Sequence, residues 1–206
     1  IQDFEKIIKD GYVYLDKTAL VYDLVTNGKI YLLYRPRRFG KSLLVSTLKY
    51  YFEGKKELFK GLAIDKLEKD WKQYPVLHLS FGGQNFVEPY ALDKVLEEFV
   101  AMAERIYGRE ELAETLGSRF KAVLGNAHKK TGMRAVVLID EYDKPLLDVM
   151  DMDIPVGKTQ NKISLEEYNR NLLKGFYSVF KEADADLQFV LLTGVTKFSQ
   201  VSVFSG

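Results

Sequence analysis

The stretch from residue 31 to residue 44 constrains the fold more than any other part of this sequence. An apolar run, Tyr31–Tyr34, is followed by a short loop that ends in Gly40-Lys41-Ser42. After the loop, apolar residues recur at helical spacing: Leu43, Leu44, Leu48, Tyr51 and Phe52. A strand, a tight loop and a helix in this order, with Gly-Lys-Ser at the junction, predict a loop that binds phosphate groups.

The residue types at the end of this loop suit that role. Gly40 lets the backbone approach a phosphate, Lys41 places a positive charge on the outer phosphates, and Ser42 offers a hydroxyl to Mg²⁺. The helix that begins here directs its positive end and its free N–H groups toward the same anion. We therefore expect a phosphate-bearing ligand at this junction.

The beginning of the loop departs from the usual pattern. Arg35 stands where phosphate loops usually have a glycine, and Pro36 fixes a backbone angle and removes an N–H donor. Arg37 and Arg38 add positive charge where other loops carry small residues. We expect at least one of the two to reach phosphate. The alternative is a basic strand-to-helix turn that binds no ligand, so the interpretation depends on the rest of the chain.

Composition limits the class of protein. The chain has 206 residues, 47% of them hydrophobic, which is enough for one α/β domain with a buried core. Its net charge of +1 gives no general attraction to nucleic acid or membranes. The lack of cysteine excludes disulfides and thiolate metal sites and fits a reducing, cytoplasmic compartment. We find no apolar run long enough to span a bilayer and no signal-peptide pattern.

Strand-like and helical segments alternate along the chain. Strands are expected at 12–15, 30–34, 76–81, 135–139 and 188–192, and helices at 16–27, 41–52, 90–107, 109–130 and 164–180. This alternation predicts a three-layer α/β/α domain with a mostly parallel sheet. Residues 1–29 are expected to be a lead-in strand and helix, 55–74 a short helix and connector, and 144–163 a mobile acidic loop. His78, in an apolar alternation, is expected to be a packed core residue.

Two further strands are expected to end in polar residues. The run 135–139 is short and continuously apolar, which is typical of a central parallel strand, and it leads directly into Asp140-Glu141. The last strand ends at Thr193, which is followed by Thr196 and Lys197. Because ligands of parallel sheets bind at the carboxyl ends of the strands, these residues are expected near the phosphate loop.

These residues have the chemistry of a nucleotide-hydrolase site. Asp140 would hold Mg²⁺ beside Ser42, and Glu141 would orient or deprotonate the attacking water. Thr193 is expected to bond that water or the γ-phosphate, and Lys197 to offset charge in the transition state. Alternatively, the two carboxylates are a solvated cap of the next helix and Thr193 belongs to an ordinary turn. The joint occurrence of loop, acidic pair and polar strand end favours the site.

The runs 35–43, 138–146 and 192–199 together resemble the bacterial AAA-ATPase-like family, and so does the run 14–18. The similarity spans essentially the whole chain, 1–206, and Arg35 in place of glycine is then a habit of the family. The resemblance implies a P-loop sheet of the additional-strand type with ATP and Mg²⁺ as ligands. The expected ATP-binding residues are Arg35, Pro36, Arg37, Arg38, Phe39, Gly40, Lys41, Ser42 and Leu43.

Members of the family often carry a PD-(D/E)XK nuclease-like domain C-terminal to the ATPase domain. Neither a nuclease motif nor a second arginine-bearing lid is matched here, so we expect the chain to stop before both. Nucleic acid is then expected as a partner only through that further domain. The resemblance leaves room for self-association, and no membrane partner is expected.

Two functions fit these expectations. The first is a Mg²⁺-dependent ATPase that hydrolyses ATP to ADP and phosphate and so drives or gates a C-terminal effector domain. The second is a nucleotide-gated binding module in which hydrolysis is slow or absent. A small-molecule kinase fits less well, because the carboxylate directly after the metal-binding aspartate is better suited to activating water.

Overall fold

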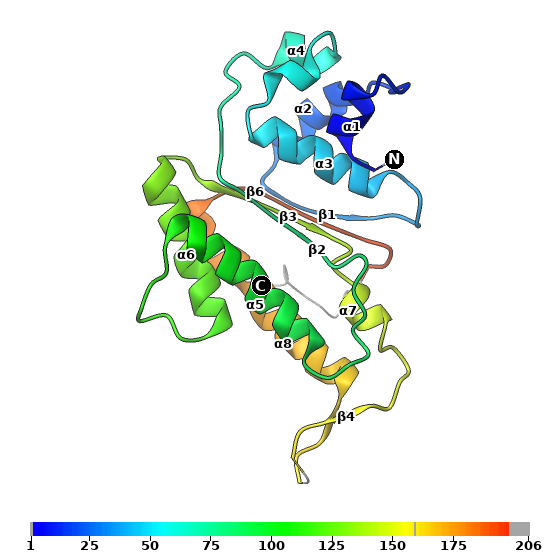
Figure 1. Ribbon diagram of the computed structural model, residues 1–206, viewed down its shortest axis with the longest axis vertical. Helices are drawn as coiled ribbons and strands as arrows, with labels where there is room; N and C mark the ends of the chain where they lie inside the picture. The colour runs from blue at the N-terminus through cyan, green and yellow to red at the C-terminus, as the bar shows by residue number, and fades with distance from the viewer. Residues whose placement is uncertain (1, 159, 198–206) are drawn as a thin grey trace.

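A four-stranded parallel sheet forms the middle layer of the protein (Figure 1). The computed structural model describes residues 2–158 and 160–197. The strands of the sheet are β1 (Ile30–Tyr34), β2 (Val76–Ser80), β3 (Ala135–Asp140) and β6 (Leu187–Gly194). Their order is β1-β6-β3-β2, and all neighbouring pairs are parallel. β6 thus lies between β1 and β3, which is the additional-strand arrangement that the resemblance implies.

Helices cover both faces of this sheet (Figure 1). One face carries α1 (Phe4–Lys9), α2 (Thr18–Asn27), α3 (Lys41–Phe52) and α4 (Ala63–Leu67), with a 3₁₀ turn at Lys56–Phe59. The other face carries α5 (Ala91–Tyr107), α6 (Leu116–Thr131) and α8 (Leu165–Glu182). A second 3₁₀ turn, Asp184–Asp186, leads from α8 into β6. The predicted three-layer α/β/α fold is therefore confirmed.

The central strand β3 explains why both faces are covered. All six of its residues are buried. Ala135, Val137 and Ile139 belong to the core shared with α5, α6 and α8, whereas Val136 and Leu138 belong to the core shared with α1 and α3. Because each fully buried aliphatic side chain contributes about 1.5–3 kcal/mol, an unbroken apolar run stabilises a strand only where helices pack on both of its faces.

Side-chain caps decide where two helices begin. Ser164 precedes α8, and its hydroxyl accepts a hydrogen bond of 3.1 Å from the backbone N–H of Glu167, which is one of the two bonds of a capping box. Thr115 caps α6 in the same way through the N–H of Ser118. The helix expected from residue 109 therefore begins only at Leu116, because this cap fixes its first turn.

The expectations for residues 1–29 were partly wrong. Residues 12–15 form no strand: Val13 is fully exposed, Leu15 is exposed, and no neighbouring strand pairs with them. Instead, the described part of this segment contains α1 and α2. α1 was not predicted, and it packs Phe4 against Phe59 with ring centroids 4.8 Å apart.

Two further expectations are corrected. Residues 144–163 are not one acidic loop, because they contain α7 (Lys144–Leu147) and a small antiparallel hairpin of β4 (Pro155–Val156) and β5 (Ile163–Ser164). Val149, Val156 and Leu165 form a small core that explains this order. His78 is not a core residue: its side chain lies exposed on the edge strand β2, while its neighbours in the strand point into the core.

Candidate functional site

The loop between β1 and α3 lies at the carboxyl end of the sheet. Arg38 and Gly40 both have positive φ angles, 68° and 74°, and Gly40 is the N-cap of α3. A glycine adopts this left-handed conformation without the steric cost that a side chain would bring. The turn directs the first N–H groups of α3, which lack intrahelical acceptors, toward the space beyond the strand ends.

Lys41 extends back along this loop. Its ammonium group donates hydrogen bonds of 2.7 Å to the carbonyl oxygens of Arg35 and Pro36, and its side chain is largely buried. The N–H of Arg35 in turn donates to the carbonyl oxygen of Gly194 at the end of β6. The loop, its lysine and the neighbouring strand end are thus connected by hydrogen bonds.

Asp140 connects three segments of the site. Its Oδ2 accepts a hydrogen bond of 2.6 Å from the hydroxyl of Ser42. Its Oδ1 accepts from the backbone N–H of Glu141 at 3.1 Å and from the hydroxyl of Thr193. A carboxylate that is only 5% exposed requires such partners, because burial without them is costly. The end of β3 is therefore held against both α3 and β6.

Glu141 has an unusual backbone conformation. Its φ is 57°, a left-handed value that costs of order 1–3 kcal/mol for a residue with a side chain. Its carboxylate lies beside the turn that follows β2, where a Cβ added at Gly82 would come within 3.0 Å of its Oε1. A side chain at residue 82 would therefore crowd this carboxylate and require its terminal oxygen to shift slightly.

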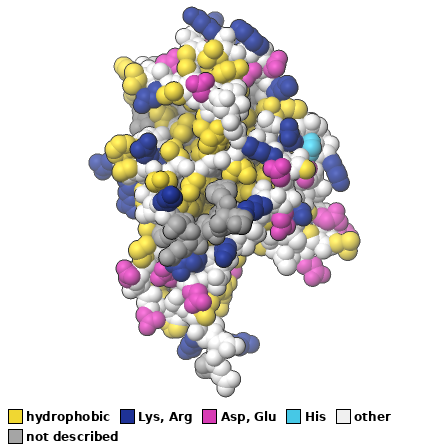
Figure 2. Space-filling model, turned by 180° about the vertical axis from the view of Figure 1, so that it is seen from behind, with side chains coloured by type: hydrophobic (Ala, Val, Ile, Leu, Met, Phe, Trp, Pro, Cys, Tyr) yellow, Lys and Arg dark blue, Asp and Glu magenta, His cyan; other side chains and the backbone are white. Residues whose placement is uncertain are grey.

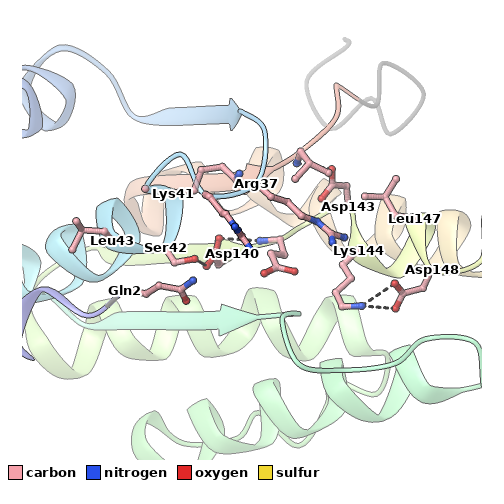
Figure 3. A pocket seen from close by; sticks show the side chains of 14 residues that line it. Gln2, Arg37, Lys41, Ser42, Leu43, Asp140, Asp143, Lys144, Leu147 and Asp148 are labelled. Carbon is pink, nitrogen blue, oxygen red and sulfur yellow. Dashed lines mark hydrogen bonds and ion pairs between the residues drawn. The ribbon is translucent and has the colours of Figure 1, made fainter.

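A cavity of about 590 Å³ unites these groups (Figure 3). The residues that line it are Gln2, Arg37, Arg38, Gly40, Lys41, Ser42, Leu43, Asp140, Glu141, Asp143, Lys144, Leu147, Asp148 and Val195. Lys144 donates hydrogen bonds of 2.7 and 2.8 Å to Asp148 across one end of the cavity. Within residues 2–158 and 160–197, neither Arg37 nor Arg38 forms an ion pair, so both charges are available to an anion.

The structure brings together most of the predicted site residues, but three lie differently from the expectation. Thr193 is fully buried, and its hydroxyl bonds Asp140 instead of facing the cavity. Lys197 is exposed and does not line the cavity. Phe39 is exposed and lines a second, neighbouring cavity. Arg35 and Pro36 contribute backbone carbonyl groups to the site, through their bonds to Lys41.

Several lining residues were not predicted. Asp143 and Lys144 follow the acidic pair after one intervening residue, Tyr142, so their position in the sequence was a usable signal. Asp148 was assigned to a mobile loop, and its pairing with Lys144 depends on the turn of α7 that separates them. Gln2 reaches the cavity because α1 packs on α3, and nothing in the local sequence indicates this.

A second cavity of about 480 Å³ shares Gly40, Lys41 and Leu43 with the first. The rest of its lining is mainly apolar: Ile7, Val13, Tyr14, Leu15, Lys17, Leu20, Val21, Leu24, Leu33, Phe39, Leu44 and Thr47. Several of these side chains are exposed, among them Val13, Leu20 and Phe39. Apolar side chains also gather in the upper half of the face shown in Figure 2.

The donor atoms of the site fit Mg²⁺. Ser42 and Asp140 present a hydroxyl and a carboxylate oxygen to the same space, and Mg²⁺ prefers such oxygen ligands. Across the described residues there is no cluster of three or more histidine or acidic side chains that would form a metal cage of its own. A magnesium ion that takes few protein ligands and completes its shell with water and phosphate oxygens matches this set.

A comparison with protein families identifies the chain. A family model described as "Predicted AAA-ATPase" matches residues 1–204. The chain belongs to the AAA-ATPase-like family. The resemblance of the runs around Lys41, Asp140 and Thr193 is thereby confirmed, and the family description supports an ATPase that binds ATP.

One curated relative matches the whole chain. It is an uncharacterized protein in the vnfD 5′ region of Azotobacter chroococcum mcd 1, which is 41% identical over 208 residues. The match covers all of this AAA-ATPase-like chain and 38% of the relative, so the chain spans well under half the length of that protein. No solved structure matches the chain. Among the described helices, none is both long and apolar enough to cross a membrane.

Proposed function

We propose that this chain is a Mg²⁺-dependent ATPase domain that hydrolyses ATP to ADP and phosphate. The observation that carries the proposal is the hydrogen bond between Ser42 and Asp140 beside Lys41, because it places a hydroxyl, a carboxylate and an ammonium group around one cavity. Loop and acidic strand end are 98 residues apart in sequence. A basic turn without a ligand would not require this convergence.

The phosphate groups of ATP occupy the larger cavity in this proposal. The first N–H groups of α3 and the ammonium group of Lys41 bind the outer phosphates, and Lys41 exchanges the carbonyl oxygens of Arg35 and Pro36 for phosphate oxygens. Arg37 and Arg38 line the same cavity and add positive charge. Leu43 and Gly40 form the wall that the phosphates share with the second cavity.

Ser42 and Asp140 hold the metal. When bound, Mg²⁺ would supply positive charge against the charge that develops during phosphoryl transfer. The Ser42 hydroxyl would hold it directly, and the Asp140 carboxylate would hold it through water. Thr193 acts through Asp140, whose second oxygen it binds, and so keeps the carboxylate aimed at Ser42.

Glu141 acts on the attacking water. Glu141 follows the metal-binding Asp140 in the sequence, and its carboxylate lines the cavity. It can therefore accept a proton from the water whose oxygen attacks the γ-phosphorus as ADP leaves. Arg37, Arg38 and Lys197 are the cations of the described chain that we assign to stabilising the charge of the transition state. The exposed position of Lys197 means that it has to move to do so.

The second cavity accommodates the nucleoside. It adjoins the phosphate cavity at Gly40, Lys41 and Leu43, and its apolar lining suits the faces of a base. A triphosphate in the first cavity therefore leaves its nucleoside within reach of the second. The aromatic rings of Tyr14 and Phe39 belong to this wall.

Hydrolysis gates a further part of the longer protein in this proposal. The chain matches 38% of its longer relative, so the effector that we expect lies in the remaining sequence. The nucleotide-gated binding module remains the second candidate. The strained backbone of Glu141 favours hydrolysis over binding alone, because such conformations are retained mainly where function requires them.

Turnover of the Glu141→Gln variant tests the proposal. In the intact protein we expect ATP affinity to stay within about threefold of wild type while the Mg²⁺-dependent rate falls at least about 100-fold. Glu111→Gln, on an exposed residue, is the matched control and keeps the rate. Equal rates for wild type and Glu141→Gln would remove Glu141 from this role. ATP binding without any turnover in wild type would favour the switch.

A further inference from the structure

The buried carboxylate of Asp143 binds the segment that follows β6. Its Oδ2 accepts hydrogen bonds from the N–H of Val195 at 2.9 Å, the N–H of Thr196 at 2.8 Å and the hydroxyl of Thr196 at 2.9 Å. Asp143 is only 1% exposed, and charge-assisted bonds of this kind are the strong ones. Two chain segments 53 residues apart are thus joined by a single oxygen atom.

Tyr142 binds the same segment through two further hydrogen bonds. Its backbone N–H donates to the carbonyl oxygen of Thr193 at 2.8 Å, and its hydroxyl donates to the carbonyl oxygen of Thr196 at 2.9 Å. A Cβ added at Gly194 would lie 2.5 Å from the Tyr142 ring and 2.8 Å from Cγ of Asp143. Only a glycine fits there, so the two segments are in close contact at Gly194.

This clamp, formed by Tyr142 and Asp143, begins directly after Glu141. Glu141 has the left-handed φ of 57°, its N–H donates to Asp140, and its carbonyl oxygen accepts from the N–H of Lys144 at 3.0 Å. A strained residue keeps its conformation only where the surrounding structure determines it. The residues before and after Glu141 are anchored on β6, through Thr193 and through the clamp.

The clamp is also braced from the helical layer. The hydroxyl of Tyr177 in α8 donates to the carbonyl oxygen of Tyr142 at 3.2 Å, and Tyr177 is fully buried. On the other side of the clamp, Val195 lines the phosphate cavity. The clamp therefore joins a buried helix to one wall of the site. Asp143 lines the same cavity, but its Oδ2 is already engaged by Val195 and Thr196.

We propose that Asp143 and Tyr142 are positioning residues, which fix the carboxylate of Glu141 and the segment 193–196 relative to each other. This inference rests on the proposed ATPase function. Lys41, Ser42 and the loop 35–40 bind the nucleotide, whereas the clamp sets the geometry in which Glu141 meets the attacking water. Loss of the clamp therefore lowers kcat and leaves nucleotide affinity nearly unchanged.

Asp143→Ala tests the clamp in the intact protein. We expect kcat to fall about 10- to 100-fold while the Kd for ATP stays within about threefold. Thr196→Val, which removes one of the three bonds, gives a smaller loss, and Thr196→Ser restores it. Because both changes break the same interaction, the double variant Asp143→Ala/Thr196→Val is no slower than Asp143→Ala alone.

Asn169→Ala is the control for a loss of stability alone. Asn169 is also 1% exposed and donates to the carbonyl oxygen of Pro145, and among the described residues its side chain has no hydrogen bond to residues 193–196. At a matched loss of Tm, this variant keeps kcat. Equal kcat losses in Asn169→Ala and Asp143→Ala, or an unchanged kcat in Asp143→Ala, would overturn the inference.

A second readout separates the clamp from the ATPase proposal. Hydrogen exchange at the amides of Val195 and Thr196 is expected to speed up at least about tenfold in Asp143→Ala and to stay slow in Asn169→Ala. If wild type hydrolyses ATP while Asp143→Ala has unchanged kcat and unchanged hydrogen exchange, the positioning role of the clamp is wrong and the ATPase proposal is unaffected. If folded wild type does not hydrolyse ATP, the proposed hydrolysis is wrong, and the role assigned to the clamp is wrong as well.

Discussion

The hydroxyl of Ser42 donates a hydrogen bond of 2.6 Å to Oδ2 of Asp140. This contact joins the first turn of α3 to the end of β3, which is not a neighbour of β1 in the sheet because β6 lies between the two strands. At this distance the Ser42 hydroxyl oxygen and the Asp140 Oδ2 can both bind one metal ion. Their hydrogen bond keeps the two oxygens aligned before the ion binds. Each side chain is therefore expected to lose its function when the other is removed.

Asp140→Asn and Ser42→Ala are predicted to abolish the gain in ATP affinity that Mg²⁺ provides. The amide is a weaker ligand than the carboxylate, and alanine offers no ligand, so affinity in Mg²⁺ should fall at least about tenfold, or about 1.4 kcal/mol. Calorimetric titration with Mg²⁺ or with EDTA measures this gain. Asp151→Asn, on an exposed residue, serves as the control. An undiminished Mg²⁺ effect in both variants would place the metal elsewhere.

The second cavity is predicted to bind the nucleoside and not the phosphates. Leu20 lines this cavity and is 65% exposed, so Leu20→Glu places a charge in its wall without opening the core. ATP affinity should fall about five- to tenfold, because an apolar contact is lost and a carboxylate lies near the base. Tripolyphosphate affinity should not change.

Two comparisons make this prediction specific. Leu112→Glu is the matched control, because Leu112 is 90% exposed and lines neither cavity. A parallel loss of tripolyphosphate binding in Leu20→Glu would show that the change acts through the loop and not through the base. If neither ligand binds to wild type, the assignment of the phosphate cavity fails as well.

Arg119 is predicted to be important for stability. Arg119 belongs to α6 and is only 7% exposed. Its guanidinium group donates hydrogen bonds to two residues of α5, to Glu104 at 2.5 and 2.9 Å and to Glu97 at 2.6 and 2.7 Å. Arg119→Met leaves the buried Glu104 with only the more distant Arg109, at 3.4 Å. Removing one partner of a buried pair costs about 3–5 kcal/mol.

Urea unfolding measures this loss. Because the cost comes mainly from the carboxylate left behind, the double variant Arg119→Met/Glu104→Leu should recover a large part of it. Arg105→Met, on an exposed residue of α5, should change stability little. A loss below about 1 kcal/mol in Arg119→Met would mean that the pair behaves like a surface ion pair.

Stability is predicted to fall in alkaline solution. Burial, followed by the hydrogen bond of 2.8 Å to Asp93, raises the pKa of Tyr168 to about 12. Burial likewise raises the pKa of Tyr177, Tyr50 and Tyr51 above the ordinary value. Tyrosines of the unfolded chain lose their protons near pH 10, where these folded residues keep theirs. Their contribution is therefore fully present below about pH 10 and is lost as the pH rises toward 12.

Urea midpoints from about pH 8 to 11 measure this dependence. Tyr168→Phe should flatten the decline above pH 10, since phenylalanine has no proton to lose. Tyr12→Phe, at an exposed position, should leave the slope unchanged. An identical slope in wild type and Tyr168→Phe would remove Tyr168 from this account.

The parts of the fold that the sequence predicted are those with a strong local pattern. The unbroken apolar run of β3, the helical spacing after Ser42 and the helix expected from residue 164 each depend on a pattern within one element. α1 was missed because its six residues contribute only Phe4 and Ile7 to the core, too few for a periodic signal. The strand expected at 12–15 has apolar residues but no partner strand, and only tertiary context supplies that information.

The candidate site likewise has parts that the sequence could predict and parts that it could not. Lys41, Ser42, Asp140 and Glu141 were predictable because each residue type follows a strand at a position where ligands bind. The bond from Thr193 to Asp140 and the clamp on residues 193–196 were not, because they depend on the lateral order of the strands. Sequence spacing places a residue at the end of a strand, but it does not decide whether its side chain faces the cavity or the neighbouring strand.

The two hydrogen bonds of Lys41 to its own loop have a consequence for nucleotide entry. An incoming triphosphate competes with the carbonyl oxygens of Arg35 and Pro36 for one ammonium group, so occupation frees both peptide groups. Arg35 is in turn bonded through its N–H to Gly194. In the proposed ATPase, the loss of these two bonds would loosen a loop that stays tied through Arg35 to the end of β6, the strand end next to the residues that Tyr142 and Asp143 bind.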